Sequence, residues 1–190
     1  MFGVQFFFMA LERTDSYLKD SIEVFHYYKK LAERAMEQCG DAQLFKSLDA
    51  ESNSIAIVVK HMVGNMRSRW RDFLTTDGEK PDRNRDSEFE TPATSRTELM
   101  DQWNAGWKWL FDALKPLTGA DLTKTVYIRG EAHSVMQAIN RQIAHYSYHV
   151  GQIVFLAKHL GSDSWKSLTV PRKGSASFNA DVSSGKKSQR

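Results

Sequence analysis

The sequence has very little cysteine and little net charge. Cys39 is its only cysteine, which excludes an intrachain disulfide and is compatible with a reducing compartment. The formal net charge of +3 over 190 residues is too small to demand nucleic acid or an acidic membrane as a partner. No apolar run reaches the roughly 20 residues of a membrane-spanning helix. The apolar start, MFGVQFFFMALER, lacks the basic region and cleavage site of a secretory signal. We therefore expect a cytoplasmic protein without a membrane or nucleic-acid partner.

Proline is also scarce, and strand patterns are weak. The four prolines, at positions 81, 92, 116 and 171, all fall at the edges of segments with helical periodicity. Apolar residues recur at spacings of three and four over about 8–39, 52–74, 95–116 and 132–160. This pattern predicts an all-α fold, a four-helix bundle forming a single domain over 1–170. VYIRGE (126–131) is the one stretch that could be extended.

Three polar stretches mark connections and ends. DGEKPDRNRDSEFETP (77–92) is rich in helix-breaking residues and predicts a long exposed loop between the second and third helices. SRTE (95–98) has the pattern of a capping box, with Ser95 as the N-cap and Glu98 three residues later. The segment 171–190 is rich in Ser, Gly and Lys and predicts a flexible basic tail.

Two histidines lie four residues apart in HYSYHVGQI (145–153). Neutral imidazole is the commonest metal ligand among side chains, and positions i and i+4 share one face of a helix, so His145 and His149 could reach one ion. An open catalytic site of the zinc type needs three protein ligands. We expect the third to be His61, which borders the apolar stripe of the second helix.

Small and amide side chains accompany these histidines. Gly64 and Gly151 would let the two helices approach closely, as a site between helices requires. Asn65, Gln142 and Gln152 each lie about one helical turn from a histidine. Their amides are candidates to hydrogen-bond the metal ligands or a substrate.

The pattern alone leaves another interpretation open. A histidine on an apolar helix face is more often a core residue than a ligand, and pairs at i and i+4 arise by chance. We assign His26, His133 and His159 structural roles. His26 lies between Phe25 and Tyr27, His133 lies at a helix start, and His159 lies in a last turn, where a cation complements the helix dipole. Cys39 sits at the end of a helix, where nothing lowers its thiol pKa, and is expected to be structural as well.

These residues resemble a known family. The chain resembles the DinB/YfiT-like superfamily of bacterial four-helix-bundle proteins, in a branch that carries only a domain-of-unknown-function label. That superfamily has one histidine late in its second helix, matched by His61. It has an H-x-x-x-H-x-G-Q motif in its fourth helix, matched by His145, His149, Gly151 and Gln152. The resemblance runs from about residue 8 to about residue 180 and includes the stretches 77–86, 128–135 and 164–180.

The resemblance implies a divalent metal, most often nickel or zinc, bound by the three histidines, and a homodimer. Relatives are metal-dependent thiol transferases that use bacillithiol, mycothiol or glutathione, or thiol-dependent isomerases. The expected function is therefore a metal-dependent thiol S-transferase, with a small-molecule thiol and an electrophile as partners. A metal-dependent hydrolase and a non-catalytic metal-binding or ligand-binding stress-response dimer remain alternatives. No general base emerges, since neither Tyr148 nor Glu131 has a physical argument for that role.

Overall fold

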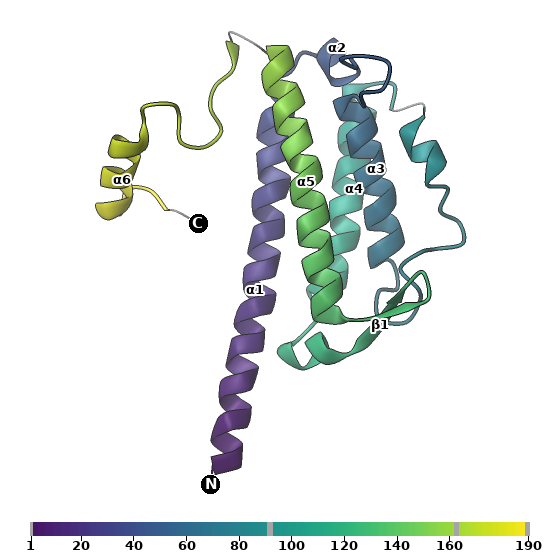
Figure 1. Cartoon of the computed structure of the whole chain (residues 1–190), viewed down its shortest axis with the longest axis vertical. Coiled ribbons are helices and arrows are strands. Elements are labelled where there is room, and N and C mark those ends of the chain that lie inside the picture. Colours follow the sequence, from purple (N-terminus) through teal and green to yellow (C-terminus); the bar gives the residue numbers. More distant parts are fainter. Residues whose placement is uncertain (1, 91–92, 162–163, 189–190) are drawn as a thin grey trace.

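Four long helices make up most of the chain. The computed structural model describes residues 2–90, 93–161 and 164–188, with side chains from residue 14 onward. The long helices lie side by side (Figure 1) and are α1 (Phe2–Met36), α3 (Ile55–Trp70), α4 (Arg96–Leu114) and α5 (Val135–Gly161). The N-terminal part of α1 extends beyond the other three helices (Figure 1). Among the described residues, no helix has the length and apolar character to cross a bilayer.

The expectation of a purely all-α fold is wrong, because the fold is mostly helical with a two-stranded sheet. Strands β1 (Thr125–Ile128) and β2 (Glu131–Ser134) pair antiparallel, with Ile128 opposite Glu131. The two residues between the strands, Arg129 and Gly130, have φ of 56° and 77°. A two-residue turn with both φ values positive matches the twist of a β-hairpin. The hairpin includes VYIRGE, the stretch that the sequence marked as extended.

Aromatic side chains from all four long helices meet in the core. Phe25 of α1 lies 6.2 Å from Trp70 of α3 and 6.4 Å from Trp107 of α4, measured between ring centroids. Tyr146 of α5 lies 5.9 Å from Trp107 and is fully buried. Because the Tyr146 side chain points into the core, the rotation of α5 about its own axis is fixed. The side chain of the preceding residue, His145, therefore points to one side of Tyr146.

The helix starts agree with local capping chemistry. Ser54 precedes α3, and its hydroxyl accepts a hydrogen bond from the Ile57 amide at 3.2 Å. The Ser95 hydroxyl accepts one from the Glu98 amide at 3.2 Å, so the predicted N-cap of α4 is confirmed. The Glu98 carboxylate, however, accepts from the amide and hydroxyl of Thr94 and not from Ser95, so only half of the capping box forms.

The connecting segments are more ordered than the sequence indicates. A short helix, α2 (Asp41–Leu44), follows α1, and a 3-10 turn, η2 (Gly119–Thr123), precedes the hairpin. The predicted loop 77–92 contains a second 3-10 turn, η1 (Asp86–Phe89), which packs against α3. Its description as exposed is wrong for Lys80 and Glu88, which are buried. Residues 91–92 of that predicted loop lie outside the described residues.

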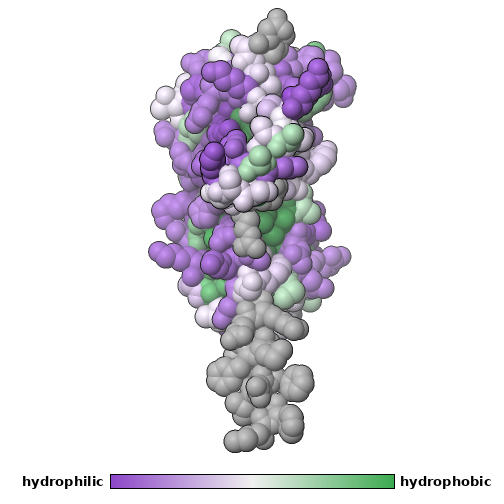
Figure 2. All heavy atoms as spheres, turned by 90° about the vertical axis from the view of Figure 1, so that its left-hand side faces the viewer, coloured by the Kyte–Doolittle hydropathy of each residue, from purple (hydrophilic) through white to green (hydrophobic). Residues whose placement is uncertain are grey.

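The C-terminal segment forms a helix where the sequence predicted a flexible tail. Helix α6 spans Ser175–Ser183, and none of its residues is buried. Figure 1 shows α6 apart from the long helices, and Figure 2 shows mainly hydrophilic residues on the face of the molecule that carries this segment.

Candidate metal centre

Helices α3 and α5 bring His61, His145 and His149 together. The Nε2 atom of His145 lies 3.4 Å from Nε2 of His61 and 3.1 Å from Nε2 of His149. One nitrogen from each ring lies within 4.8 Å of the other two. His61 is buried, and the other two rings are partly buried. The three histidines predicted from two distant segments therefore form one cluster.

The hydrogen bonds that His61 and His149 form through Nδ1 determine which nitrogen of each ring carries the proton. The other nitrogen offers its lone pair to the cluster. Nδ1 of His61 lies 2.8 Å from Oε2 of Glu88, and an ionised carboxylate can only accept. Nδ1 of His149 lies 2.8 Å from Oε1 of Gln152, an amide oxygen that also accepts. Both Nδ1 atoms therefore carry the proton, and the Nε2 lone pairs of His61 and His149 point into the cluster.

The spacing of the nitrogens fits a metal ion. A tetrahedral ion with metal–nitrogen bonds of about 2.0–2.1 Å separates two ligand nitrogens by roughly 3.3–3.4 Å. Two of the three separations, 3.4 Å and 3.1 Å, are close to that value, and the separation between the nitrogens of His61 and His149 is at most 4.8 Å. Three imidazoles suit zinc, nickel, copper or iron, so the cluster could bind a metal ion whose identity the ligands leave open.

Burial keeps the rings of α5 neutral. It lowers the pKa of His145 to about 3, and the positive charges that His149 and His61 would carry act in the same direction. Burial also lowers the pKa of His149. Both rings are therefore neutral, with one proton each, at neutral pH, which is the form that binds metals.

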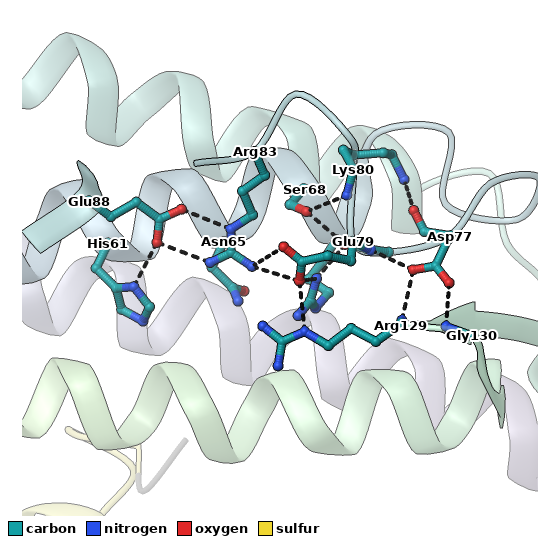
Figure 3. Close-up of polar contacts among 12 residues, drawn as sticks. His61, Asn65, Ser68, Asp77, Glu79, Lys80, Arg83, Glu88, Arg129 and Gly130 are labelled. Carbon is teal, nitrogen blue, oxygen red and sulfur yellow. Dashed lines mark hydrogen bonds and ion pairs between the residues drawn. The ribbon is translucent and has the colours of Figure 1, made fainter. Parts of the chain in front are cut away.

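Glu88 is the residue of this site that the sequence did not reveal (Figure 3). Its carboxylate accepts from Nε of Arg83 at 2.8 Å and from Nη2 of Arg83 at 3.0 Å, in addition to His61. Burial opposes ionisation of Glu88, but the hydrogen bonds from His61 and Arg83 outweigh it and lower the pKa of the carboxyl. Glu88 is therefore a buried carboxylate that orients a candidate ligand.

Gly64 makes room for that carboxylate. A Cβ atom at Gly64 would lie 2.3 Å from Oε1 and 2.6 Å from Cδ of Glu88. The close approach expected at Gly64 is thus made by a loop side chain and not by a facing helix. At Gly151 a Cβ would meet nothing within 4 Å, so the predicted close approach of helices does not occur there.

A chain of ion pairs connects Glu88 with the β-hairpin (Figure 3). Arg83 also faces Glu79, whose Oε2 lies 3.3 Å from Nη1 of Arg83. Glu79 Oε2 accepts in turn from Nη1 of Arg69 and from Nε of Arg129, each at 3.1 Å. The Asp77 carboxylate accepts from the backbone amides of the hairpin turn at 2.8 Å and 2.7 Å. The loop after α3 is therefore anchored at both ends, and Glu88 has little freedom.

The sequence matches the model of a family described as protein of unknown function (DUF1572) over residues 12–174. The chain belongs to this family. No curated protein and no solved structure matches the chain. The match agrees with the expected domain-of-unknown-function branch, and the place of that branch in the DinB/YfiT-like superfamily stays a prediction.

The amide residues predicted around the DUF1572 histidines have three different environments. Gln152 bonds His149, and its Nε2 also donates to the Tyr148 hydroxyl at 3.3 Å. Asn65 accepts from the buried Tyr146 hydroxyl at 3.0 Å. Gln142 is 3% exposed, and its Oε1 has no hydrogen-bond partner among the described residues.

The residues assigned structural roles lie outside the cluster. His26 stacks on Phe111 with 3.9 Å between centroids, and Nδ1 of His133 lies 3.0 Å from the carbonyl oxygen of Glu131. His159 stacks on Phe155. Cys39 is buried, and burial raises its pKa, so its thiol stays protonated at neutral pH.

A cavity of about 340 Å³ lies beside the cluster. His145 and its neighbour Ala144 contribute to its wall, together with residues of α3 and α5 that lie about one to two turns closer to the hairpin. One of the three candidate ligands, His145, thus borders a space large enough for a small molecule.

Proposed function

We propose that this chain binds one divalent metal ion, nickel or zinc, through His61, His145 and His149, and that it is a metal-dependent thiol S-transferase acting on a small electrophile. One observation carries the metal part of the proposal. Glu88 and Gln152 each accept a hydrogen bond from Nδ1–H of a histidine, so that two Nε2 lone pairs converge beside His145. Without a metal ion, the single proton of a neutral His145 can be donated to only one of these two lone pairs, whereas a metal ion uses all three rings as ligands.

The number of ligands favours a reactive ion over a purely structural one. Structural zinc sites have four protein ligands, whereas catalytic sites have three and leave one position open. The cluster in the described residues consists of three histidines, and the 340 Å³ cavity adjoins it. A bound ion would acidify a coordinated thiol, or a water in the hydrolase alternative, because three neutral ligands leave its full charge in place.

The resemblance to the DinB/YfiT-like superfamily favours the thiol over water. It also supports two structural proposals: that the four long helices form a bundle of that type, and that the protein is a cytoplasmic homodimer. Light scattering during gel filtration measures the oligomeric state directly.

Metal content tests the first part of the proposal. The wild-type protein, purified without a chelator or a His tag, should carry about one metal ion per chain. His61→Ala should lose it, and the matched control His159→Ala, a histidine of α5 outside the cluster, should keep it. A wild-type protein that takes up no nickel or zinc, even after addition, would contradict the proposal.

Catalysis is tested separately with the metal-loaded protein. Consumption of a thiol together with an electrophile such as 1-chloro-2,4-dinitrobenzene should be faster than in the His61→Ala variant. Release of nitrophenol from a nitrophenyl ester without any thiol would favour the hydrolase. A loaded protein with neither activity would point to the non-catalytic alternative.

A further inference from the structure

The cavity beside His145 has a polar and positively charged wall. Its lining comes from α3 and α5 and consists of Asn65, Arg69, Arg141, Gln142, Ala144 and His145. No acidic side chain is among these described residues. Two arginines, one from each helix, therefore line a space that also reaches His145, one of the three candidate ligands.

Three of these polar side chains are almost completely buried. Asn65 and Arg69 are each 5% exposed, and Gln142 is 3% exposed. Burying polar groups between two helices destabilises a fold unless every hydrogen bond is made. Here Nε of Arg69, a donor, has no partner among the described residues; Oε1 of Gln142 has none either, but it is an acceptor and would not bind an anion. The packing of α3 against α5 does not explain why these buried side chains are polar. A polar ligand in the cavity would explain it.

The charge of the wall is only partly neutralised. Arg69 donates to the Gly78 carbonyl and to Glu79, but Glu79 also faces the guanidinium groups of Arg83 and Arg129. Arg83 is also bound by Glu88, so Glu79 mainly neutralises Arg69 and the exposed Arg129. Arg141 is exposed at the rim and forms no ion pair with any described residue. The cavity consequently favours an anion.

We propose that this cavity binds the carboxylate of the small thiol that the metal centre uses, so that the substrate is a mercaptocarboxylate. This inference rests on the proposed function of the three histidines. Guanidinium groups bind carboxylates through charge-assisted and often bidentate hydrogen bonds. The Gln142 and Asn65 amides form the inner wall, and Arg141 closes the site at the rim.

The test compares each thiol acid with its neutral amide. The cobalt-loaded protein is titrated with 3-mercaptopropionate and with 3-mercaptopropionamide, and binding is followed by the thiolate-to-cobalt absorption band. The shorter pair, mercaptoacetate and mercaptoacetamide, covers a different spacing between sulfur and carboxylate. For each pair, the ratio of the affinity for the acid to the affinity for the amide is compared between the wild type and the variants. The intrinsic difference between acid and amide cancels in this comparison.

Arg141→Gln should lower the acid-to-amide ratio at least about tenfold. Gln142→Glu, which places a negative charge in the wall, should lower it as well. Lys158→Gln removes the same charge from an exposed position of α5 away from the cavity and should leave the ratio unchanged. Circular dichroism and cobalt stoichiometry show whether each variant is folded and loaded.

The outcomes separate the two proposals. An equal ratio in wild type, Arg141→Gln and Gln142→Glu would overturn the carboxylate site while leaving the metal centre intact. A wild-type protein that takes up no cobalt would overturn the metal centre and this inference with it. A ratio that falls as much in Lys158→Gln as in Arg141→Gln would mean that general charge, and not the cavity, attracts the acid.

Discussion

Replacing Glu88 by glutamine tests whether the loop after α3 prepares His61 for a metal. The carboxylate accepts from His61 and, through both oxygens, from Arg83. A glutamine offers one oxygen and one NH₂ group in the same place. If the oxygen faces His61, the NH₂ group meets the guanidinium of Arg83, and two donors then oppose each other. If the amide turns around, the Nδ1 proton of His61 loses its acceptor.

The expected loss follows from this geometry. Removing the hydrogen-bond partner of a metal-bound histidine typically weakens metal affinity about 10–100-fold, or roughly 1.4–2.7 kcal/mol. Breaking a buried ion pair by removing one partner costs about 3–5 kcal/mol of folding free energy. Both side chains of this pair are buried, 4% and 6% exposed. We expect the lower end of that range, because Glu79 still faces Arg83.

The assay is a competition titration with a chelator of known zinc affinity. It is combined with urea unfolding of the metal-free protein, so that metal affinity and folding are measured separately. Glu90→Gln is the matched control, since Glu90 is exposed and lies two residues from Glu88. A folded Glu88→Gln protein with wild-type zinc affinity would refute the argument that the carboxylate orients His61.

Three further predictions follow from the same geometry. Gly64→Ala should displace the Glu88 side chain and weaken metal binding about tenfold or more, whereas Gly151→Ala, where a Cβ meets nothing, should not; the same competition titration checks both. The folded pKa of His145 is about 3, whereas an unfolded chain protonates it near 6.5. The unfolded state therefore binds more protons between these values, so the metal-free protein should lose stability as the pH falls from 6.5 towards 3. The slope from this ring is less than about 1.4 kcal/mol per pH unit, since the ring is partly exposed. The urea concentration at the midpoint of unfolding should differ less between pH 7 and pH 5 in His145→Gln than in the wild type. An unchanged difference would contradict a buried, neutral His145 ring. Tyr146→Phe removes a hydroxyl that bonds a buried indole and a buried amide, and should cost about 1–3 kcal/mol in urea unfolding; a cost near zero would show that water replaces it.

Local chemistry explains why much of the fold could be predicted from the sequence. Helical periodicity depends on residues three and four apart, so the approximate positions of α1, α3, α4 and α5 follow from the chain itself. The N-cap at Ser95 likewise needs only its own hydroxyl and the next turn. The observed structure deviates from the prediction where the local sequence signal is weak. The hairpin depends on two left-handed residues, Arg129 and Gly130, that the sequence does not single out.

The sequence by itself determined the three candidate ligands, because histidines at i and i+4 on one helix and a third on the border of another can be recognised from spacing. Only the tertiary structure decided what surrounds them. Glu88 is 27 positions from His61, in a loop that also carries Asp82 and Glu79, and nothing in its local sequence distinguishes it from those acids. Asn65, one turn from His61, bonds the Tyr146 hydroxyl, a partner that its spacing in the sequence does not indicate. Both outcomes depend on how the loop and α5 pack against α3, and such long-range packing is a property of the folded chain as a whole.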